Sequence, residues 1–398
     1  MDLYHFPADL AQFIDEVAGG SPSDPGALAT QVLTLSNAFL GKTDWQAGYA
    51  KDPALRRAYL QYYLPVNLPK IQVPLTAWLA SDRHRFTGKR LRILDLGSGP
   101  GSALLGTLDF VRRLAADEQP AGIELVALDQ SFETLRDAER LVGLMRPTME
   151  ALPIDFRALR LDLVAERSQL FPLAASAGRF DLVIAANVLC ELGRNQEDAV
   201  DPACALVSAA VEEVLAPDGA LAIIEPGSRE IARDLHRIRD RLLSGSSLHA
   251  LAPCLHDLPC PALGTERDWC IHDLPWRPPA TVRDVDRRTG LDKSSLKFAY
   301  LLLAQLQAAP SHVGRWRVVS DVLEMKGERR VYLCADGRWI VLGQLKRAEG
   351  SEVARTFAGL SRGDLIEVSG MEAKGSLFRL PPVGSIRKLD GRPATVAP

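Results

Sequence analysis

The stretch from Arg92 to Ala103, RILDLGSGPGSA, decides the fold of this chain. A short apolar run enters Asp95, and glycines follow at Gly97, Gly99 and Gly101. An apolar pattern with helical spacing begins directly afterwards. A strand, a glycine-rich turn and a helix in this order open a nucleotide-binding α/β unit. The glycines let the backbone turn sharply and let a ligand lie against bare main chain.

The chemistry of this loop narrows the choice of ligand. Its G-x-G-x-G spacing differs from the G-x-G-x-x-G of dinucleotide sites, and the Gly-Lys-Ser/Thr of a triphosphate loop does not occur in it. Asp95 would repel a pyrophosphate, whereas a carboxylate suits a ligand that carries an ammonium and a sulfonium. S-adenosylmethionine (SAM) is such a ligand, so the loop predicts a SAM site.

The loop and the elements after it resemble class I SAM-dependent methyltransferases. The next predicted strand ends in Asp129, where that family binds the ribose hydroxyls, and Asp162 stands where the family often contacts the adenine. The fourth strand leads into Asn187. The resemblance implies the following set of SAM-binding residues: Asp95, Gly97, Ser98, Gly99, Gly101, Asp129, Gln130, Asp162 and Asn187.

The predicted fold class is α/β, with the Rossmann-like sheet of class I methyltransferases, an N-terminal helical cap and a Cys-rich metal-binding insertion. The strands read as continuous apolar runs, which suits a parallel sheet that is covered on both faces. We expect these strands near residues 92–96, 123–128, 158–161, 180–185 and 220–225. We expect four parts in the chain: a helical cap (1–87), a SAM-binding core (88–245), a Cys-rich insertion with a closing hairpin (246–348) and a C-terminal extension (349–398).

Composition and charge exclude several classes. Of the 398 residues, 47% are hydrophobic and 24% are charged, which is an ordinary globular balance. No apolar run approaches the roughly 18 residues of a membrane span. The first 16 residues contain neither Lys nor Arg, which argues against a secretory or transit peptide and predicts a cytoplasmic protein. The net charge is −3, but residues 226–347 hold 20 Lys and Arg against 14 Asp and Glu, which is compatible with RNA contact.

Three cysteines stand in a Pro-rich stretch that reads as a loop. Cys254, Cys260 and Cys270 lie there, and Cys334 ends a predicted strand further on. Four thiolates on a metal would explain cysteines in such an irregular backbone. The spacing matches neither a zinc finger nor the ferredoxin run. From the spacing alone, zinc, an iron–sulfur cluster and unrelated reduced thiols all remain open.

The segments APCLHDLPCP and DWC resemble the mitochondrial small-ribosomal-subunit assembly family of methyltransferase-like proteins, which also has bacterial members. The similarity covers most of the chain, although Ile271 stands where the family tends to place His. The resemblance implies small-subunit or ribosomal RNA as the partner, with neither membrane nor DNA expected. It also implies a [4Fe-4S] cluster on four cysteines: Cys254, Cys260, Cys270 and Cys334.

A hairpin is predicted over residues 326–345, because Asp336-Gly337 separates two β-rich runs. We expect it to supply, with residues 316–323, the antiparallel edge strands of the SAM-binding sheet. Its basic residues are candidate phosphate contacts: Arg329, Arg330, Arg338, Lys346 and Arg347.

Three functions fit this reading. The first is a ribosomal RNA methyltransferase. The second is a non-catalytic assembly factor that holds SAM as a structural ligand, and the third is a small-molecule methyltransferase with a zinc site. After Asn187 the chain reads Val-Leu-Cys in place of the Pro-Pro-Tyr of many base methyltransferases. No general base stands out, so the catalytic residues stay unassigned.

Overall fold

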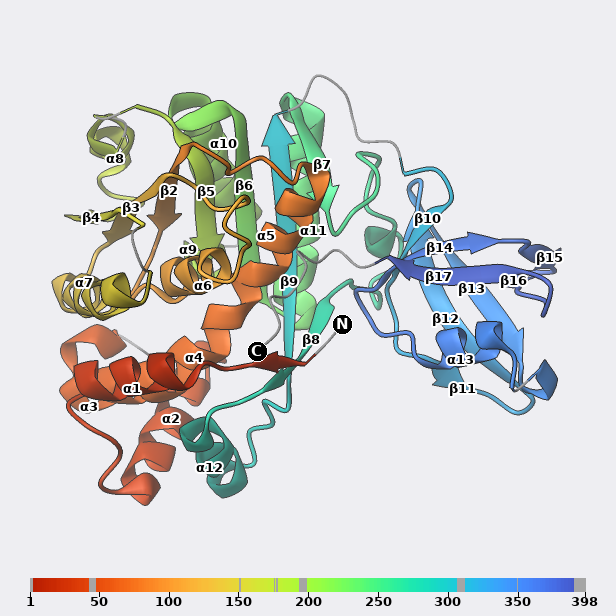
Figure 1. The fold of residues 1–398 in the computed structure, drawn as a ribbon, viewed down its shortest axis with the longest axis horizontal. Coiled ribbons are helices and arrows are strands. Elements are labelled where there is room, and N and C mark those ends of the chain that lie inside the picture. Colours follow the sequence, from red (N-terminus) through yellow and green to blue (C-terminus); the bar gives the residue numbers. More distant parts are fainter. Residues whose placement is uncertain are drawn as a thin grey trace.

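The structure is a computed structural model that describes residues 3–42, 48–149, 152–174, 176, 178–192, 199–305, 312–348 and 350–389. It holds a large α/β part and a smaller β part that lies beside it (Figure 1). Among the described residues, no helix combines the length and apolar character that crossing a bilayer requires.

The large part is built on a nine-stranded sheet of order β1-β8-β9-β6-β5-β2-β3-β4, with β7 paired to β9. Strands β2 to β6 are parallel, and β9 runs antiparallel to β6. The chain order reverses between β2 and β5, so ligands are expected beyond the carboxyl ends of these two strands. The strands are β1 (Tyr4–His5), β2 (Arg90–Leu96), β3 (Gly122–Asp129), β4 (Ile154–Arg160), β5 (Phe180–Ala186), β6 (Leu215–Pro226), β7 (Leu248–Ala252), β8 (His272–Arg277) and β9 (Ser295–Gln305).

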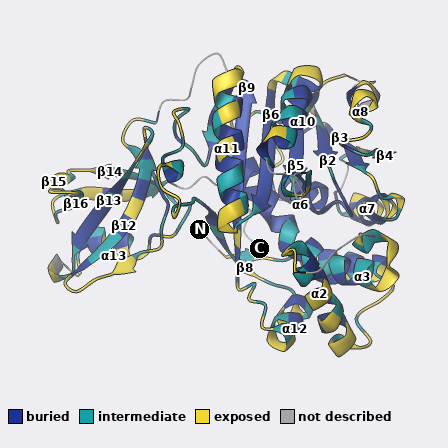
Figure 2. Ribbon diagram, turned by 180° about the vertical axis from the view of Figure 1, so that it is seen from behind, coloured by how far each residue is buried: buried dark blue, intermediate teal, exposed yellow. Residues whose placement is uncertain are grey.

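Helices cover both faces of this sheet. On one face α5, α6 and α7 pack with one set of strand side chains, such as Ile93 and Leu125. On the other face α10 and α11 pack with the alternate set, such as Leu94 and Val126. The strands are therefore buried on both sides, as the apolar runs predict (Figure 2). The helices after β2 are α6 (Ser102–Val111), α7 (Phe132–Met145), α8 (Arg167–Ala174), α9 (Leu189–Leu192), α10 (Val200–Glu213), α11 (Arg229–Gly245) and α12 (Ala280–Thr289).

The N-terminal segment is helical. Its helices α1 to α4 lie beneath the sheet in the view of Figure 1. Asp24 and Asp52 accept hydrogen bonds from the first backbone N–H groups of α2 and α3, and proline follows each of them. The elements are α1 (Ala8–Val17), α2 (Pro25–Phe39), α3 (Pro53–Ala58), a π-helical turn (Tyr59–Tyr63), α4 (Leu64–Asn67), a 3₁₀ turn (Leu68–Ile71) and α5 (Gln72–Ser81).

The predicted hairpin exists, but its predicted place is wrong. β12 (Glu328–Ala335) and β13 (Arg338–Leu345) pair antiparallel across Asp336 and Gly337. They belong to a second sheet with its own hydrophobic core, around Val331, Leu333 and Leu342. The physical reason is that β9 already occupies the edge: its apolar run FAYLLLA pairs with β6 over seven residues and is buried throughout.

The second sheet has the order β15-β16-β13-β12-β10-β14-β17, with β11 paired to β12. One helix, α13, packs against its core through the fully buried Phe357. Besides β12 and β13, its elements are β10 (Arg315–Val318), β11 (Leu323–Glu324), α13 (Glu352–Ala358), β14 (Leu365–Ser369), β15 (Glu372–Lys374), β16 (Leu377–Arg379) and β17 (Ser385–Leu389).

Candidate functional site

The glycine loop after β2 forms a tight cradle. Gly97, Gly99 and Gly101 have φ angles of 68°, 53° and 83°, which L side chains rarely adopt. A Cβ atom on Gly97 would lie 2.4 Å from the Cγ2 of Val188. The loop is tied to the neighbouring strand, because the N–H of Ser98 donates to the carbonyl of Leu128 at 2.8 Å.

Asp95 is the unusual group of this cradle. Its side chain is buried, and neither carboxylate oxygen has a hydrogen-bond partner among the described residues. The hydroxyls of Ser98 and Ser102 are likewise buried and unpartnered there. Burial raises the pKa of Asp95 to about 7. Buried polar groups without partners are rare in folded proteins, so a ligand that supplies donors and positive charge fits this cradle.

Asp129 closes the cradle from the end of β3. Its carboxylate accepts from the N–H of Gly99 at 2.8 Å and from the N–H of Ser131 at 2.8 Å. Burial raises the pKa of Asp129. The hydroxyl of Thr134 also donates to this carboxylate at 3.3 Å. A carboxylate has about four lone-pair positions, so these three bonds leave room for a ribose hydroxyl. The neighbouring Gln130 is exposed.

The remaining predicted residues follow the next strands at the same edge. Asp162 comes after β4 and accepts from the N–H groups of Val164 and Ala165, so it also caps a local turn. Asn187 follows β5 with a φ of 55°, an uncommon angle for a residue other than glycine. Its N–H donates to the carbonyl of Ile224 on β6. The structure thus places all the predicted SAM-binding residues along the carboxyl ends of adjacent parallel strands.

Two buried ionisable groups near this edge were missed as site residues. Lys70 is 7% exposed, and its Nζ donates to the Oδ1 of Asn67 at 2.7 Å. Glu225, near the end of β6, accepts from the N–H of Leu189 at 2.9 Å, while its Oε2 has no partner among the described residues. Burial lowers the pKa of Lys70 to about 7 and raises that of Glu225 to about 7. Groups with such pKa values can exchange protons at neutral pH.

A signal for Lys70 is present in the sequence. It stands within the apolar stretch LPKIQVPL, where a charged side chain is unexpected.

An aromatic wall faces the glycine loop. The rings of Tyr49 and Tyr59 stack with centroids 4.4 Å apart, and the Tyr49 hydroxyl would lie 3.4 Å from a Cβ on Gly99. The wall therefore comes from the N-terminal helical segment.

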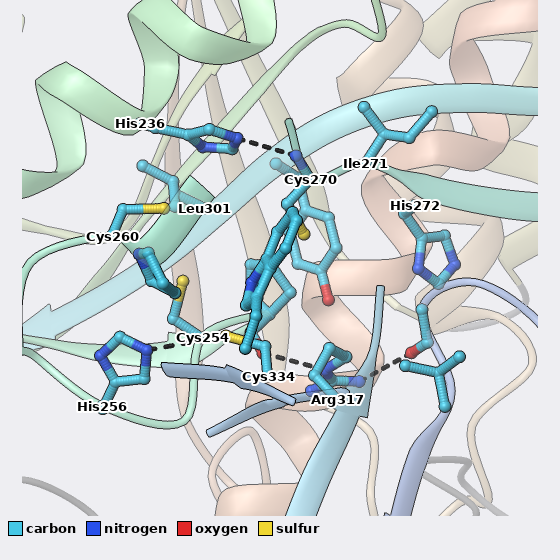
Figure 3. A pocket seen from close by; sticks show the side chains of 16 residues that line it. His236, Cys254, His256, Cys260, Cys270, Ile271, His272, Leu301, Arg317 and Cys334 are labelled. Atoms are coloured by element: carbon cyan, nitrogen blue, oxygen red, sulfur yellow. Dashed lines mark hydrogen bonds between the residues drawn. The ribbon is translucent and has the colours of Figure 1, made fainter. Parts of the chain in front are cut away.

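The four cysteines line one pocket between the two sheets (Figure 3). Cys254, Cys260 and Cys270 come from the segments around β7 and β8, whereas Cys334 comes from β12 of the second sheet. Three histidines, His236, His256 and His272, also line it, together with residues of the second sheet such as Arg317 and Trp339. Within the described ranges, no three His, Cys, Asp or Glu side chains converge closely enough to hold a metal ion.

The Cys loop is held by a buried arginine. Arg239 on α11 is fully buried, and it donates to the Sγ of Cys254 at 3.2 Å and to the carbonyl of Leu258 at 2.8 Å. The carboxylate of the next residue, Asp240, accepts from the N–H of Cys260 at 2.9 Å. The loop is therefore ordered by protein contacts, and Arg239 places a positive charge beside a sulfur that would carry negative charge as a thiolate.

Burial also sets the protonation of the pocket. It raises the pKa of the Cys260 and Cys270 thiols to about 12 and that of Cys334 further. The Nε2 of His236 accepts from the N–H of Cys270 at 3.0 Å, and burial lowers the pKa of this histidine to about 3. His236 is thus a neutral acceptor that positions Cys270. The thiols release protons when a metal binds them.

The chain belongs to the family described as mitochondrial small ribosomal subunit Rsm22, which matches residues 56–351. A search of curated proteins gives no match. Several solved structures are similar to this chain. The trans-methyltransferase CalH in complex with SAH has 20% identity and a TM-score of 0.30, over 50% of this chain and 48% of that one.

Two bacterial structures show the same degree of likeness. A type I restriction-modification methyltransferase subunit from Streptococcus thermophilus has 14% identity and a TM-score of 0.35, over 73% of this chain and 56% of that one. A class I SAM-dependent methyltransferase from Listeria monocytogenes has 12% identity and a TM-score of 0.37, over 77% and 90%. This chain therefore spans only about half the length of CalH and of the Streptococcus subunit.

Proposed function

We propose that this protein binds SAM in the glycine-loop cradle, holds a [4Fe-4S] cluster on its four pocket cysteines, and acts on RNA of the small ribosomal subunit during assembly. The observation that carries the SAM assignment is the buried, unpartnered carboxylate of Asp95. An ammonium group would supply both the missing donors and the opposite charge.

We prefer a cluster to a single zinc ion because of the resemblance of the cysteine-bearing segments to the small-subunit assembly family. A tetrahedral zinc site with Zn–S bonds of about 2.3 Å needs sulfurs about 3.8 Å apart. Four thiols surround this pocket, yet no three metal-binding side chains among the described residues converge on one ion. A [4Fe-4S] cluster would bind each of its four cysteines through a different iron. We assign Cys254, Cys260, Cys270 and Cys334 as its ligands.

The buried lysine and glutamate provide a route for proton transfer. Bound SAM would supply a methyl group on a sulfonium. When an RNA amino or hydroxyl group takes that methyl group, it must lose a proton. Lys70, with its pKa near 7, is neutral often enough to accept this proton, and Glu225 is a second acceptor close to it. Asn67 orients the Lys70 amine through their 2.7 Å hydrogen bond.

The small-subunit role rests on membership of the Rsm22 family, whose description names the mitochondrial small ribosomal subunit. The test is sedimentation of tagged protein in a lysate gradient at low salt. We expect it to migrate with small-subunit particles and to leave them as salt rises, because contacts with phosphates weaken with salt. Sedimentation entirely with free proteins would contradict the small-subunit role and would favour a small-molecule substrate.

A labelled-methyl assay separates catalysis from a structural use of SAM. Purified protein, small-subunit particles and SAM with a labelled methyl group are incubated together, and label in the RNA is counted. Incorporation above that of a SAM-free control supports a methyltransferase. Tight SAM binding without any incorporation would support the non-catalytic assembly factor.

A further inference from the structure

The second sheet closes on itself. Its two ends are β15 and β17, but β14 and β15 follow each other in the chain, as do β16 and β17. β14 pairs antiparallel with β17, and β15 pairs antiparallel with β16, so the four segments form the two strands of one long hairpin. Gly370 and Gly384 meet between these two pairings, where a Cβ on Gly370 would lie 3.1 Å from the Cα of Gly384. The result is a five-stranded barrel, here called the C-terminal barrel (residues 315–389).

The connectivity of this barrel is that of an OB-fold. Its first strand, β10, pairs antiparallel with β12 and with β14. Its third strand, β13, pairs in parallel with the start of the last strand, β16, and α13 stands between the third and fourth strands. Phe357 and Leu360, on α13 and just after it, join the interior core. OB-folds bind oligonucleotides on the face of their second and third strands and on the adjoining loops.

In this barrel the corresponding face belongs to β12 and β13. Their inward side chains, such as Leu333 and Leu342, are buried in the barrel core. The alternate side chains point outward, and the rings of Tyr332 and Trp339 lie there with centroids 6.5 Å apart. Tyr332 is 38% exposed. Trp339 also lines the cysteine pocket, so Tyr332 is the ring that provides a surface platform on which a base stacks.

The adjoining loop extends the same face. The segment between β10 and β12 carries Leu323 and Met325, which are 40% and 44% exposed. Leu323 pairs with Arg330 of β12, so it lies on the outward side together with Tyr332. Large apolar side chains are usually buried, and an exposed group of them beside a charged rim is typical of a binding surface.

Charge favours a nucleic acid as the occupant of this face. Residues 312–389 contain 14 Lys and Arg against 9 Asp and Glu, an excess of five in a chain whose net charge is −3. Arg329 and Lys346 both pair with Glu324, and Arg330 pairs with Glu328, so these three predicted phosphate contacts are partly neutralised. Arg338 is exposed and lies 5.7 Å from the centroid of the Trp316 ring.

We infer that the C-terminal barrel binds single-stranded RNA across the part of its outward face around Tyr332 and Leu323, with Tyr332 stacking on a base and Arg338, at the end of the β12–β13 hairpin, contacting a phosphate. This deepens the small-subunit role proposed above, because it names the part of the RNA that is bound and the surface that binds it. The match to the Rsm22 family ends at residue 351, inside the barrel, so the inference comes from the topology and the surface.

The test measures binding of the full-length protein to a fluorescent single-stranded RNA of about 12 nucleotides, by anisotropy, at about 0.1 M salt. Tyr332→Ala should weaken binding about tenfold, because one stacked base is lost, while Tyr332→Phe should stay within about twofold. Arg338→Ala should reduce the slope of log affinity against log salt by about one. Leu40→Ala, an exposed apolar residue outside the barrel, is the matched control and should bind as the wild type does.

Two outcomes would overturn the inference: unchanged affinity in Tyr332→Ala, or equal affinity for a duplex of the same sequence. Because Tyr332 is on the surface, its loss should leave the thermal melt unchanged, and the melt is recorded for each variant. SAM affinity and iron content are measured on the same preparations. Absence of SAM or iron with a clear Tyr332 effect would refute the proposed function and leave the barrel inference standing.

Discussion

The SAM cradle and the cysteine pocket are built in opposite ways. The cradle is made by consecutive strand ends of one parallel sheet, and its closest contacts join residues about thirty positions apart, such as Gly99 and Asp129. The cysteine pocket is shared by two sheets, and Arg317 of the barrel reaches across it to the carbonyl of Pro253 at 2.9 Å. A site within one sheet is formed as soon as that sheet folds, whereas a site between two sheets depends on their docking.

The largest expected effect separates the two sites. Cys254→Ser should abolish iron binding and loosen the barrel from the first sheet, because one ligand is lost from the shared pocket. SAM affinity should stay within about twofold, since the cradle lies within a single sheet. Iron and sulfide are measured after anaerobic purification, and hydrogen exchange is followed over residues 312–389. Cys204→Ser on α10, outside the pocket, is the control; full iron content in Cys254→Ser would remove Cys254 from the ligand set.

The next effect concerns the chemistry at the cradle. In protein that methylates small-subunit RNA, Lys70→Met should lower the single-turnover rate by a factor of about 10²–10⁴, because the proton acceptor is lost. SAM affinity should hardly change, since Lys70 is not among the predicted SAM-binding residues. Lys89→Met is the control, because Lys89 is an exposed lysine paired with Asp218. An equal rate in Lys70→Met and the wild type would exclude this role.

Two glycine substitutions test the geometry of the SAM cradle. Gly97→Ala should weaken SAM binding about a hundredfold, because its Cβ would lie 2.4 Å from Val188 and its φ is positive. Iron content should not change. Gly143→Ala on α7 meets no atom within 4 Å and should leave SAM binding intact while stabilising the helix by about 0.5–1 kcal/mol. Calorimetric titration with SAM checks both, and equal affinities would contradict the described geometry.

The smallest expected effect is a pH dependence. SAM should bind about fivefold more tightly at pH 7 than at pH 6, because Asp95, with its pKa near 7, must lose its proton to meet the ammonium group, which stays protonated over this range. In the SAM-free protein the raised pKa of Asp95 has the opposite effect on the stability of the fold, which decreases as the pH rises. The stability contributed by this group is complete below about pH 4 and is lost as the pH rises through about 7.

Asp95→Asn is the variant for this prediction. It should bind SAM weakly at every pH and should flatten the dependence of affinity on pH. Thermal melts between pH 5 and 8 should flatten too, apart from the contribution of Glu225, whose raised pKa acts in the same direction. An undiminished pH dependence in the variant would show that another group carries it.

The sequence predicted the centre of the first sheet well, because each strand end there is marked by a polar residue after an apolar run. The strands near residues 92–96, 123–128 and 180–185 are confirmed as β2, β3 and β5. β4 begins four residues earlier than predicted, since Asp155 and Arg157 interrupt its apolar pattern. The prediction that the hairpin supplies the edge strands of the first sheet was wrong. A hairpin signal is local, whereas the sheet to which the hairpin belongs depends on β9, which already occupies the edge beside β6.

The sites show the same limit. The glycine loop is recognised from its spacing, and Lys70 stands out within an apolar stretch. That Lys70 and Glu225 are buried and have shifted pKa values becomes known only from the structure. The cysteine ligand set stays a prediction, as do the predicted domain bounds and the cytoplasmic location. The position of all four cysteines around one pocket could not be derived from their spacing, because Cys334 lies 64 positions after Cys270 and belongs to another sheet.

Closure of the barrel has a practical consequence for shortened versions of this chain. A protein ending at residue 351, where the family match stops, would keep β10, β12 and β13 but lose every strand that covers their two outer margins. The N–H and C=O groups of β10 and β13 would then be open to pairing with other molecules, and the core around Trp316 and Leu342 would face water. Such a fragment should self-associate, however well the rest of it folds.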